Sequence, residues 1–237
     1  MQLDLIGAIT LTAISVLVGG VYVYFLRWSA ARQMMMAAAG VAWFALIVVC
    51  GATGALDAVR GIGPAGVGLS VLLPFLVLAF GSSRAGALRD AATAIPTPVL
   101  IGLHAVRVLG VFFLLLYSAG RLPAPDAPVA GWGDVLIGLT ALPVAWLAAL
   151  KRPGWRPIVL VWNSLGLLDL AVAIGLGVAS SPGLPFSVAS SGADTSVMTT
   201  LPWILIPSFD VPLLAYLHVL LFQQMRRRAP TIAAVTA

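Results

Sequence analysis

Seven stretches of about 20 mostly apolar residues follow one another along this chain of 237 residues. A helix needs about 20 such residues to cross the hydrocarbon core of a bilayer. Only 9% of the residues are charged, whereas soluble domains carry about 25%. The composition therefore excludes a soluble or disordered chain. It predicts an all-α polytopic membrane protein, a seven-transmembrane-helix bundle with spans at 4–26, 35–55, 65–81, 97–118, 133–150, 158–179 and 200–224.

The spans consume most of the chain, which leaves no room for a second folded domain. The longest connection, residues 180–199, is rich in Ser, Gly and Pro. We expect one transmembrane domain over residues 1–228 and a short cytoplasmic tail over 229–237. A soluble catalytic or nucleotide-binding head is excluded by length alone.

The basic residues segregate strongly if the seven helices alternate in direction. Ten of the thirteen then fall on one side of the membrane, with only Arg60 and Arg121 on the other. Lys and Arg gather in cytoplasmic loops, so the pattern predicts an outside N-terminus, a cytoplasmic C-terminus and insertion in the cytoplasmic (inner) membrane. The ten residues are Arg27, Arg32, Arg84, Arg89, Lys151, Arg152, Arg156, Arg226, Arg227 and Arg228.

Three charged residues lie at membrane depth, where topology does not explain them. Arg107 lies about 15 Å from the start of its span at 1.5 Å per residue, and Asp169 and Asp210 lie at a similar depth. Each such group costs roughly 2.5–3.5 kcal/mol at a helix centre. We expect all three to face the bundle interior, with Arg107 paired to one or both carboxylates.

The only two histidines reinforce this centre. His104 lies three residues before Arg107, so both share nearly one helix face. His218 follows Asp210 by eight residues, and Asn163 lies at about the same level in the sixth span. The polar centre is therefore expected between the fourth, sixth and seventh spans.

Prolines recur every five residues in the last span, at Pro202, Pro207 and Pro212. Each removes a backbone hydrogen bond and disturbs the preceding turn. We expect this half of the span to be kinked or partly unwound, with free carbonyl groups near Ser208 and Asp210. Broken helices at this depth often form binding sites in transporters.

The favoured interpretation is binding or translocation of a proton, ion or small polar solute. Arg107, Asp169 and Asp210 would form the site with Asn163 and Ser208, and His104 and His218 would relay protons, because imidazole titrates near neutrality. A covalent retinal protein is excluded, because the only lysine, Lys151, lies in a loop.

Three other classes remain open. His104 and His218 could ligate a haem or a metal ion. Asp169 or Asp210 could act as a general acid on a lipid or isoprenoid, although the lack of an obvious nucleophile–base set leans against an enzyme. The polar centre could also be purely structural, in an accessory subunit.

The expected partners are few. They are the lipid bilayer and a small polar ligand or ion. Nucleic acid is not expected, because Arg226–Arg228 would bind anionic headgroups. Small residues let helices approach closely but leave monomer and oligomer open; these are Gly19, Gly20, Gly133, Gly138, Gly166, Gly175 and Gly177.

Overall fold

The computed structural model describes residues 2–57, 61–84, 86–182, 188–189 and 192–227. These residues form helices and no strands, and seven of the helices are long and apolar enough to cross a membrane. The predicted fold class is therefore confirmed. The elements are α1 (Gln2–Phe25), α2 (Ala30–Thr53), α3 (Pro64–Arg84), α4 (Gly86–Thr93), α5 (Thr97–Gly102), η1 (Leu103–Gly110), α6 (Val111–Ser118), α7 (Asp126–Leu150), α8 (Trp155–Ala179), η2 (Thr195–Thr199), η3 (Ile206–Asp210) and α9 (Val211–Arg227).

Three helix boundaries differ from the predicted spans by five residues or more. The second helix begins at Ala30 rather than residue 35. The fifth span begins at Asp126 rather than residue 133, because Pro128 falls in the first helical turn, where the missing N–H group costs nothing. The last span begins at Ile206 rather than residue 200, since residues 201–204 form turns. The predicted tail at 229–237 lies outside the described residues.

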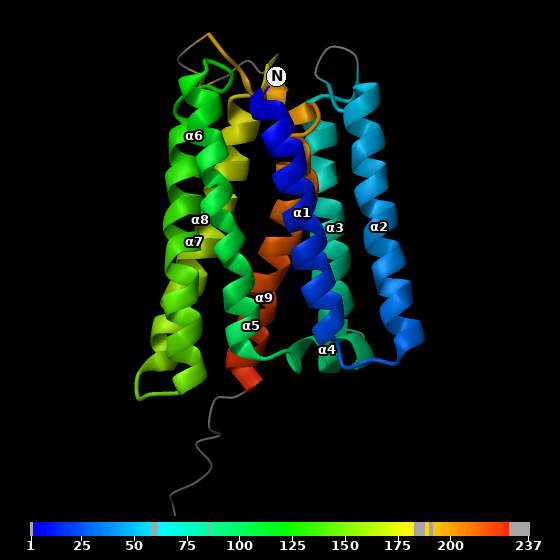
Figure 1. Cartoon of the computed structure of the whole chain (residues 1–237), viewed down its shortest axis with the longest axis vertical. Coiled ribbons are helices and arrows are strands. Elements are labelled where there is room, and N and C mark those ends of the chain that lie inside the picture. Colours follow the sequence, from blue (N-terminus) through cyan, green and yellow to red (C-terminus); the bar gives the residue numbers. More distant parts are fainter. Residues whose placement is uncertain (1, 58–60, 85, 183–187, 190–191, 228–237) are drawn as a thin grey trace, which may run out of the picture.

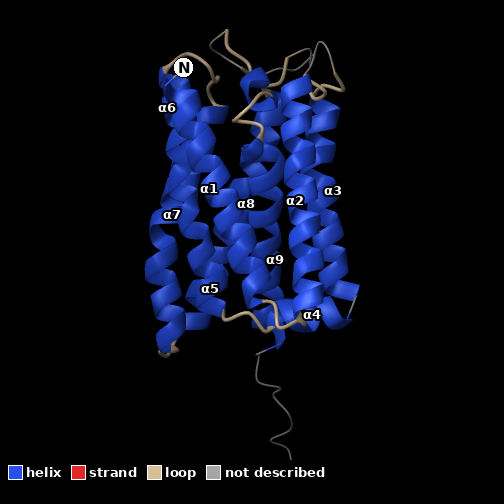
Figure 2. Ribbon diagram, turned by 45° about the vertical axis from the view of Figure 1, so that its right-hand side comes forward, coloured by secondary structure: helices blue, strands red, loops and turns tan. Residues whose placement is uncertain are grey.

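The last span is the centre of the bundle. In its most apolar window, 78% of the residues are buried, compared with 6% in α2. Figure 1 shows α5 to α8 on one side of α9 and α2 at the far edge of the other side. Figure 2, turned by 45°, shows the long helices side by side with their axes roughly aligned. Residues of η3 and α9 therefore meet side chains from most of the other spans.

The two ends of the bundle carry different charges. The chain starts at one end, and α4 lies at the opposite end (Figure 1). We call these the N-terminal end and the arginine-rich end. Arg121 lies at the N-terminal end and pairs with Asp4 at 2.8 Å, whereas Arg60 and Arg228 lie outside the described residues. The described basic residues of the arginine-rich end are Arg27, Arg32, Arg84, Arg89, Lys151, Arg152, Arg156, Arg226 and Arg227.

The fourth span changes to a 3-10 helix at mid-depth, over η1. Three residues per turn bring residues three apart into line, so His104, Arg107 and Gly110 lie along one buried face. A Cβ atom at Gly110 would collide with Asp134, and one at Gly138 would collide with the backbone of Val108. The absence of both atoms lets η1 lie directly against α7.

The last span begins with the π-helix η3, which contains Pro207 and is followed directly by α9 with Pro212. Pro212 lacks the N–H group that would bond the Ser208 carbonyl in an α-helix. The indole Nε1 of Trp43 donates to that carbonyl instead, at 3.1 Å. The expected distortion is thus present, and the freed carbonyl near Asp210 is bonded by α2.

Candidate mid-membrane polar site

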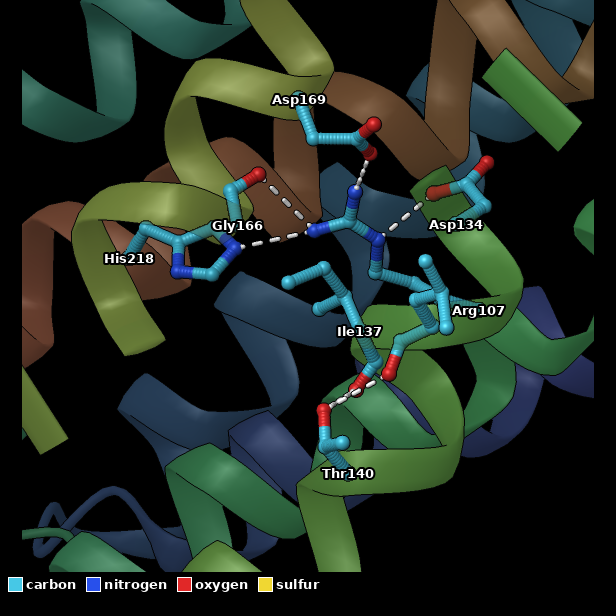
Figure 3. A network of polar contacts seen from close by, with 8 residues as sticks. Arg107, Asp134, Ile137, Thr140, Gly166, Asp169 and His218 are labelled. Atoms are coloured by element: carbon cyan, nitrogen blue, oxygen red, sulfur yellow. Dashed lines mark hydrogen bonds and ion pairs between the residues drawn. The ribbon is translucent and has the colours of Figure 1, made fainter. Parts of the chain in front are cut away.

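Arg107 is the centre of the polar network. Its side chain is only 1% exposed, and four of the five N–H groups of a guanidinium have partners. Nε donates to Asp134 Oδ1 at 2.6 Å, and Nη2 donates to Asp169 Oδ2. Nη1 donates to the Gly166 carbonyl at 3.0 Å and contacts His218 Nε2 at 3.1 Å. Figure 3 shows the two carboxylates on different edges of the guanidinium, with Gly166 and His218 on its remaining side.

The two carboxylates come from neighbouring helices. Asp134 lies on α7 and Asp169 on α8, and a Cβ atom at Gly133 would collide with the Asp169 carboxylate. Gly133 therefore leaves the space that Asp169 occupies beside Arg107. One guanidinium between two carboxylates carries a net charge of −1 when both are ionised.

Sequence analysis missed Asp134. A span starting at residue 133 places this carboxylate at the membrane surface, whereas a helix starting at Asp126 places it two turns deep. The available signal was Pro128, which is compatible with the first turn of a helix, and Gly131 and Gly138, which are seven residues apart and lie on one side of it.

His218 has a defined tautomer in this arrangement. A guanidinium can only donate hydrogen bonds, so His218 Nε2 must accept from Arg107. The proton then lies on Nδ1, which donates to Asn163 Oδ1 at 2.7 Å. The Asn163 amide in turn donates to the His218 carbonyl at 3.0 Å. Both ring nitrogens of a neutral His218 are therefore bonded.

His104 contributes stacking. Its ring lies 3.9 Å from that of His218, centroid to centroid, with 28° between the planes. The residue is fully buried, and neither ring nitrogen has a hydrogen-bond partner among the described residues. His104 is thus an unbonded imidazole next to a bonded one.

Asp210 lies apart from the network. Its Oδ1 is 2.8 Å from the hydroxyl of Ser15 on α1, and its buried Oδ2 has no hydrogen-bond partner in the described part of the chain. Ser208 points elsewhere, with its hydroxyl 2.8 Å from that of Ser70 on α3. The structure brings Arg107, Asp169, His104, His218 and Asn163 together, but neither Asp210 nor Ser208 bonds to them.

A small cavity connects Asp210 with Arg107. This central cavity has a volume of about 40 Å³, and its wall includes Arg107, Asp134 and Asp210 among mainly apolar side chains. At about 10–15 Å³ for each water molecule, it has room for about three. The Arg107 network and Asp210 thus face one space.

The family described as "Domain of unknown function (DUF8737)" matches residues 64–226, which is more than two thirds of the chain. The chain belongs to this family. No curated protein and no solved structure matches the chain.

The DUF8737 match covers α3 to α9. It contains every residue of the Arg107 network, the two histidines and Asp210. Ser15 and Trp43, which contact the π-helical segment from α1 and α2, lie before the matched region. The central polar site is thus formed within the family domain, and α1 completes it at Asp210.

Proposed function

We propose that the chain binds and transfers protons at mid-membrane, between the Arg107 network and Asp210. The central cavity carries the proposal, because its lining includes both Arg107 and Asp210. The buried Asp210 Oδ2 has no hydrogen-bond partner among the described residues. A space for about three water molecules suits a proton or a very small cation better than an organic solute. Asp134 joins Arg107, Asp169 and Asp210 in this site.

The contacts of Asp210 suit both of its protonation states. Ser15 Oγ lies 2.8 Å from Asp210 Oδ1 and 2.8 Å from the Leu11 carbonyl, and a hydroxyl has only one proton to donate. When Asp210 is ionised, Ser15 donates to it. When Asp210 is protonated, it can donate to Ser15, which then donates to Leu11. A proton can therefore bind and leave without repacking of these side chains.

The histidines supply the next step toward the arginine-rich end. His218 contacts Arg107, and His104 stacks on His218. An imidazole can accept a proton on one nitrogen and release one from the other. Because the stacked rings share no hydrogen bond, a proton passes between them only when one ring turns.

The same geometry argues against axial haem ligation by these residues. Both nitrogens of His218 are already bonded. The stacked rings hold their lone pairs in two planes only 28° apart and 3.9 Å from each other, whereas axial haem ligation needs one nitrogen on each side of the iron. Ligation would require His218 to leave both Arg107 and Asn163.

The test is proton flux in proteoliposomes with an enclosed pH-sensitive dye. Asp210→Asn keeps the shape of the side chain and removes its titration, and we expect flux to fall about tenfold or more. Asp90→Asn, at an exposed position of the arginine-rich end, is the matched control and should conduct like the wild type.

The same experiment separates proton transfer from a purely structural role. Asp210 makes no bond to the Arg107 network, so Asp210→Asn should leave the helix content and thermal unfolding nearly unchanged while flux falls. Wild-type flux equal to that of empty liposomes would contradict the proposal, as would undiminished flux in Asp210→Asn.

A further inference from the structure

A second cavity lies at the N-terminal end of the bundle, between α3, α7 and α8. This end cavity has a volume of about 90 Å³ and a mainly apolar lining. Its polar residues include Asp126, Ser181, Thr195 and Ser196. Ser196 is only half-buried, so the cavity reaches toward the surface at this end.

Among the described residues that line the end cavity, only Asp126 is ionisable. It is the first residue of α7 and is only 2% exposed, yet its carboxylate makes no hydrogen bond or ion pair to any residue that the structure describes. A Cβ atom added at Gly177 would lie 3.7 Å from Asp126 Oδ1, so this carboxylate lies beside α8. A buried polar group normally has a partner, so an unbonded carboxylate facing a cavity indicates a polar ligand there.

Hydroxyl groups continue this polar side of the cavity. The Ser181 and Thr195 hydroxyls lie 3.1 Å apart, and each lies 3.0 Å from the Gly177 carbonyl. Hydroxyls both donate and accept, so they can bond water beside Asp126. The polar lining thus combines one carboxylate with exchangeable protons.

The end cavity and the central cavity share one wall. Phe113, Ile206 and Val211 line both. All three side chains are apolar, and we call them the apolar wall. Phe113 comes from α6, whereas Ile206 is the first residue of the π-helical segment that carries Asp210 and Val211 follows that segment directly.

We propose that Asp126 is the proton-loading site at the N-terminal end, and that protons pass from it through the apolar wall to Asp210. The inference rests on the proposed function. A hydronium ion at the N-terminal end protonates the Asp126 carboxylate and leaves water. The O–H bond at Asp126 then breaks as one forms at Asp210 Oδ2, through water that crosses the wall, and Asp126 returns to its carboxylate form.

The apolar wall sets the rate of this passage. Apolar constrictions close a pathway by excluding water, and the Phe113 ring is the largest side chain of the wall. The charged groups facing Asp210 across the central cavity are Arg107 and Asp134. A proton reaching Asp210 is therefore held between a hydroxyl and the Arg107–Asp134 pair.

Two pairs of variants test the route in proteoliposomes. Asp126→Asn should lower proton flux about tenfold or more, whereas Asp194→Asn, which caps η2 and lines neither cavity, should not. Phe113→Ala joins the two cavities and should raise flux several-fold. Leu115→Ala, at an exposed position of the same helix, should leave it unchanged.

A measurement independent of flux uses the carboxylate composition. All eight acidic residues are Asp, so ¹³C labelling of the Asp carboxyl carbon gives eight signals that Asp→Asn variants assign. The Asp126 signal should shift as the buffer passes from acid to alkaline. A signal that does not shift would overturn the loading site.

The outcomes separate the two proposals. If the wild type conducts and Asp126→Asn conducts equally, the route through Asp126 is overturned and the proposed function stands. If Asp126 titrates but the wild type does not conduct, the proposed function fails and Asp126 remains as a proton-binding site without the onward route. A fall in flux in Asp126→Asn with a rise in Phe113→Ala supports both.

Discussion

Arg107 concentrates more interactions than any other side chain of the polar centre. Four hydrogen bonds reach α7, α8 and α9 from one residue of η1. Arg107→Gln leaves two carboxylates facing each other, and breaking a buried ion pair destabilises by about 3–5 kcal/mol. We expect unfolding in detergent, followed by circular dichroism, to show a loss of this size.

The control for Arg107 is Arg121→Gln. Arg121 also pairs with an aspartate, Asp4, but both side chains are about one third exposed. Exposed pairs contribute about 0–1 kcal/mol. Equal losses in the two variants would contradict the central role of Arg107.

Gly166 gives a sharper test of the His218 position. An added Cβ atom would lie 2.5 Å from His218 Cε1 and 2.8 Å from Nε2, whereas Gly175, on the same helix, has nothing within 4 Å. Gly166→Ala should displace the ring from Arg107 and destabilise by about 1–3 kcal/mol, while Gly175→Ala should be neutral or slightly stabilising. Detergent unfolding of both variants decides this, and a neutral Gly166→Ala would contradict the described packing.

For single residues, the sequence predicts which side chains form the polar centre better than it predicts their bonding partners. Arg107, Asp169 and the histidines stand out because charge is rare in an apolar helix. Their bonds depend on small changes of helix geometry: η1 aligns His104 with Arg107, and the early start of α7 brings Asp134 into reach. Of the glycines expected at close contacts, Gly133, Gly138 and Gly166 have them, whereas Gly19, Gly20 and Gly175 face open space. Apolar composition alone does not distinguish these two groups.

The elements differ in how firmly they are held. Ile47 is the only described residue of α2 that is buried, and this helix packs against α1 and η3. Trp43 donates to the Ser208 carbonyl and packs on Phe209, with 4.4 Å between ring centroids. The irregular segment of the last span is therefore one of the two elements that hold the most peripheral helix, the other being α1.

Trp43→Phe should loosen α2 specifically. The ring contact with Phe209 is retained, but the Ser208 carbonyl loses its donor, at about 1–3 kcal/mol for an unsatisfied buried group. Hydrogen–deuterium exchange should rise in α2 and η3 and stay unchanged in α7 and α8. Uniform exchange across all helices would contradict this local role.

The proline pattern predicts the disturbance in the last span but not its form. Pro202, Pro207 and Pro212 indicate missing hydrogen bonds, and the structure resolves them into turns followed by a π-helix. The form depends on Trp43 of α2 and Ser70 of α3, which bond Ser208 from distant parts of the chain. Such partners cannot be read from the local sequence.

Across the whole molecule, the end cavity and the hydrogen-bonded packing around Gln224 lie at opposite ends. The end cavity lies at the N-terminal end, above the central cavity. At the arginine-rich end, the buried Gln224 donates to the Thr93 and Ile95 carbonyls at 3.2 and 2.7 Å and accepts from Thr97 at 2.8 Å. Access to the polar centre is therefore more open from the N-terminal end, and the arginine-rich end is held closed by bonds between α9 and the α4–α5 connection.

Because of this asymmetry, the orientation in the membrane decides from which side protons reach Asp210. We propose that the N-terminal end faces outside. Positive charge in loops favours the cytoplasmic side. The test uses a Cys50→Ser background, which removes the only cysteine. In this background Ser118→Cys places a thiol at the N-terminal end, and Ser83→Cys places one near the arginine-rich end. Both positions are exposed. A membrane-impermeant maleimide added to intact bacterial cells should label position 118 and not position 83, and both should react after lysis. The reverse pattern would place the cavities on the cytoplasmic side and reverse the direction in which protons reach Asp210.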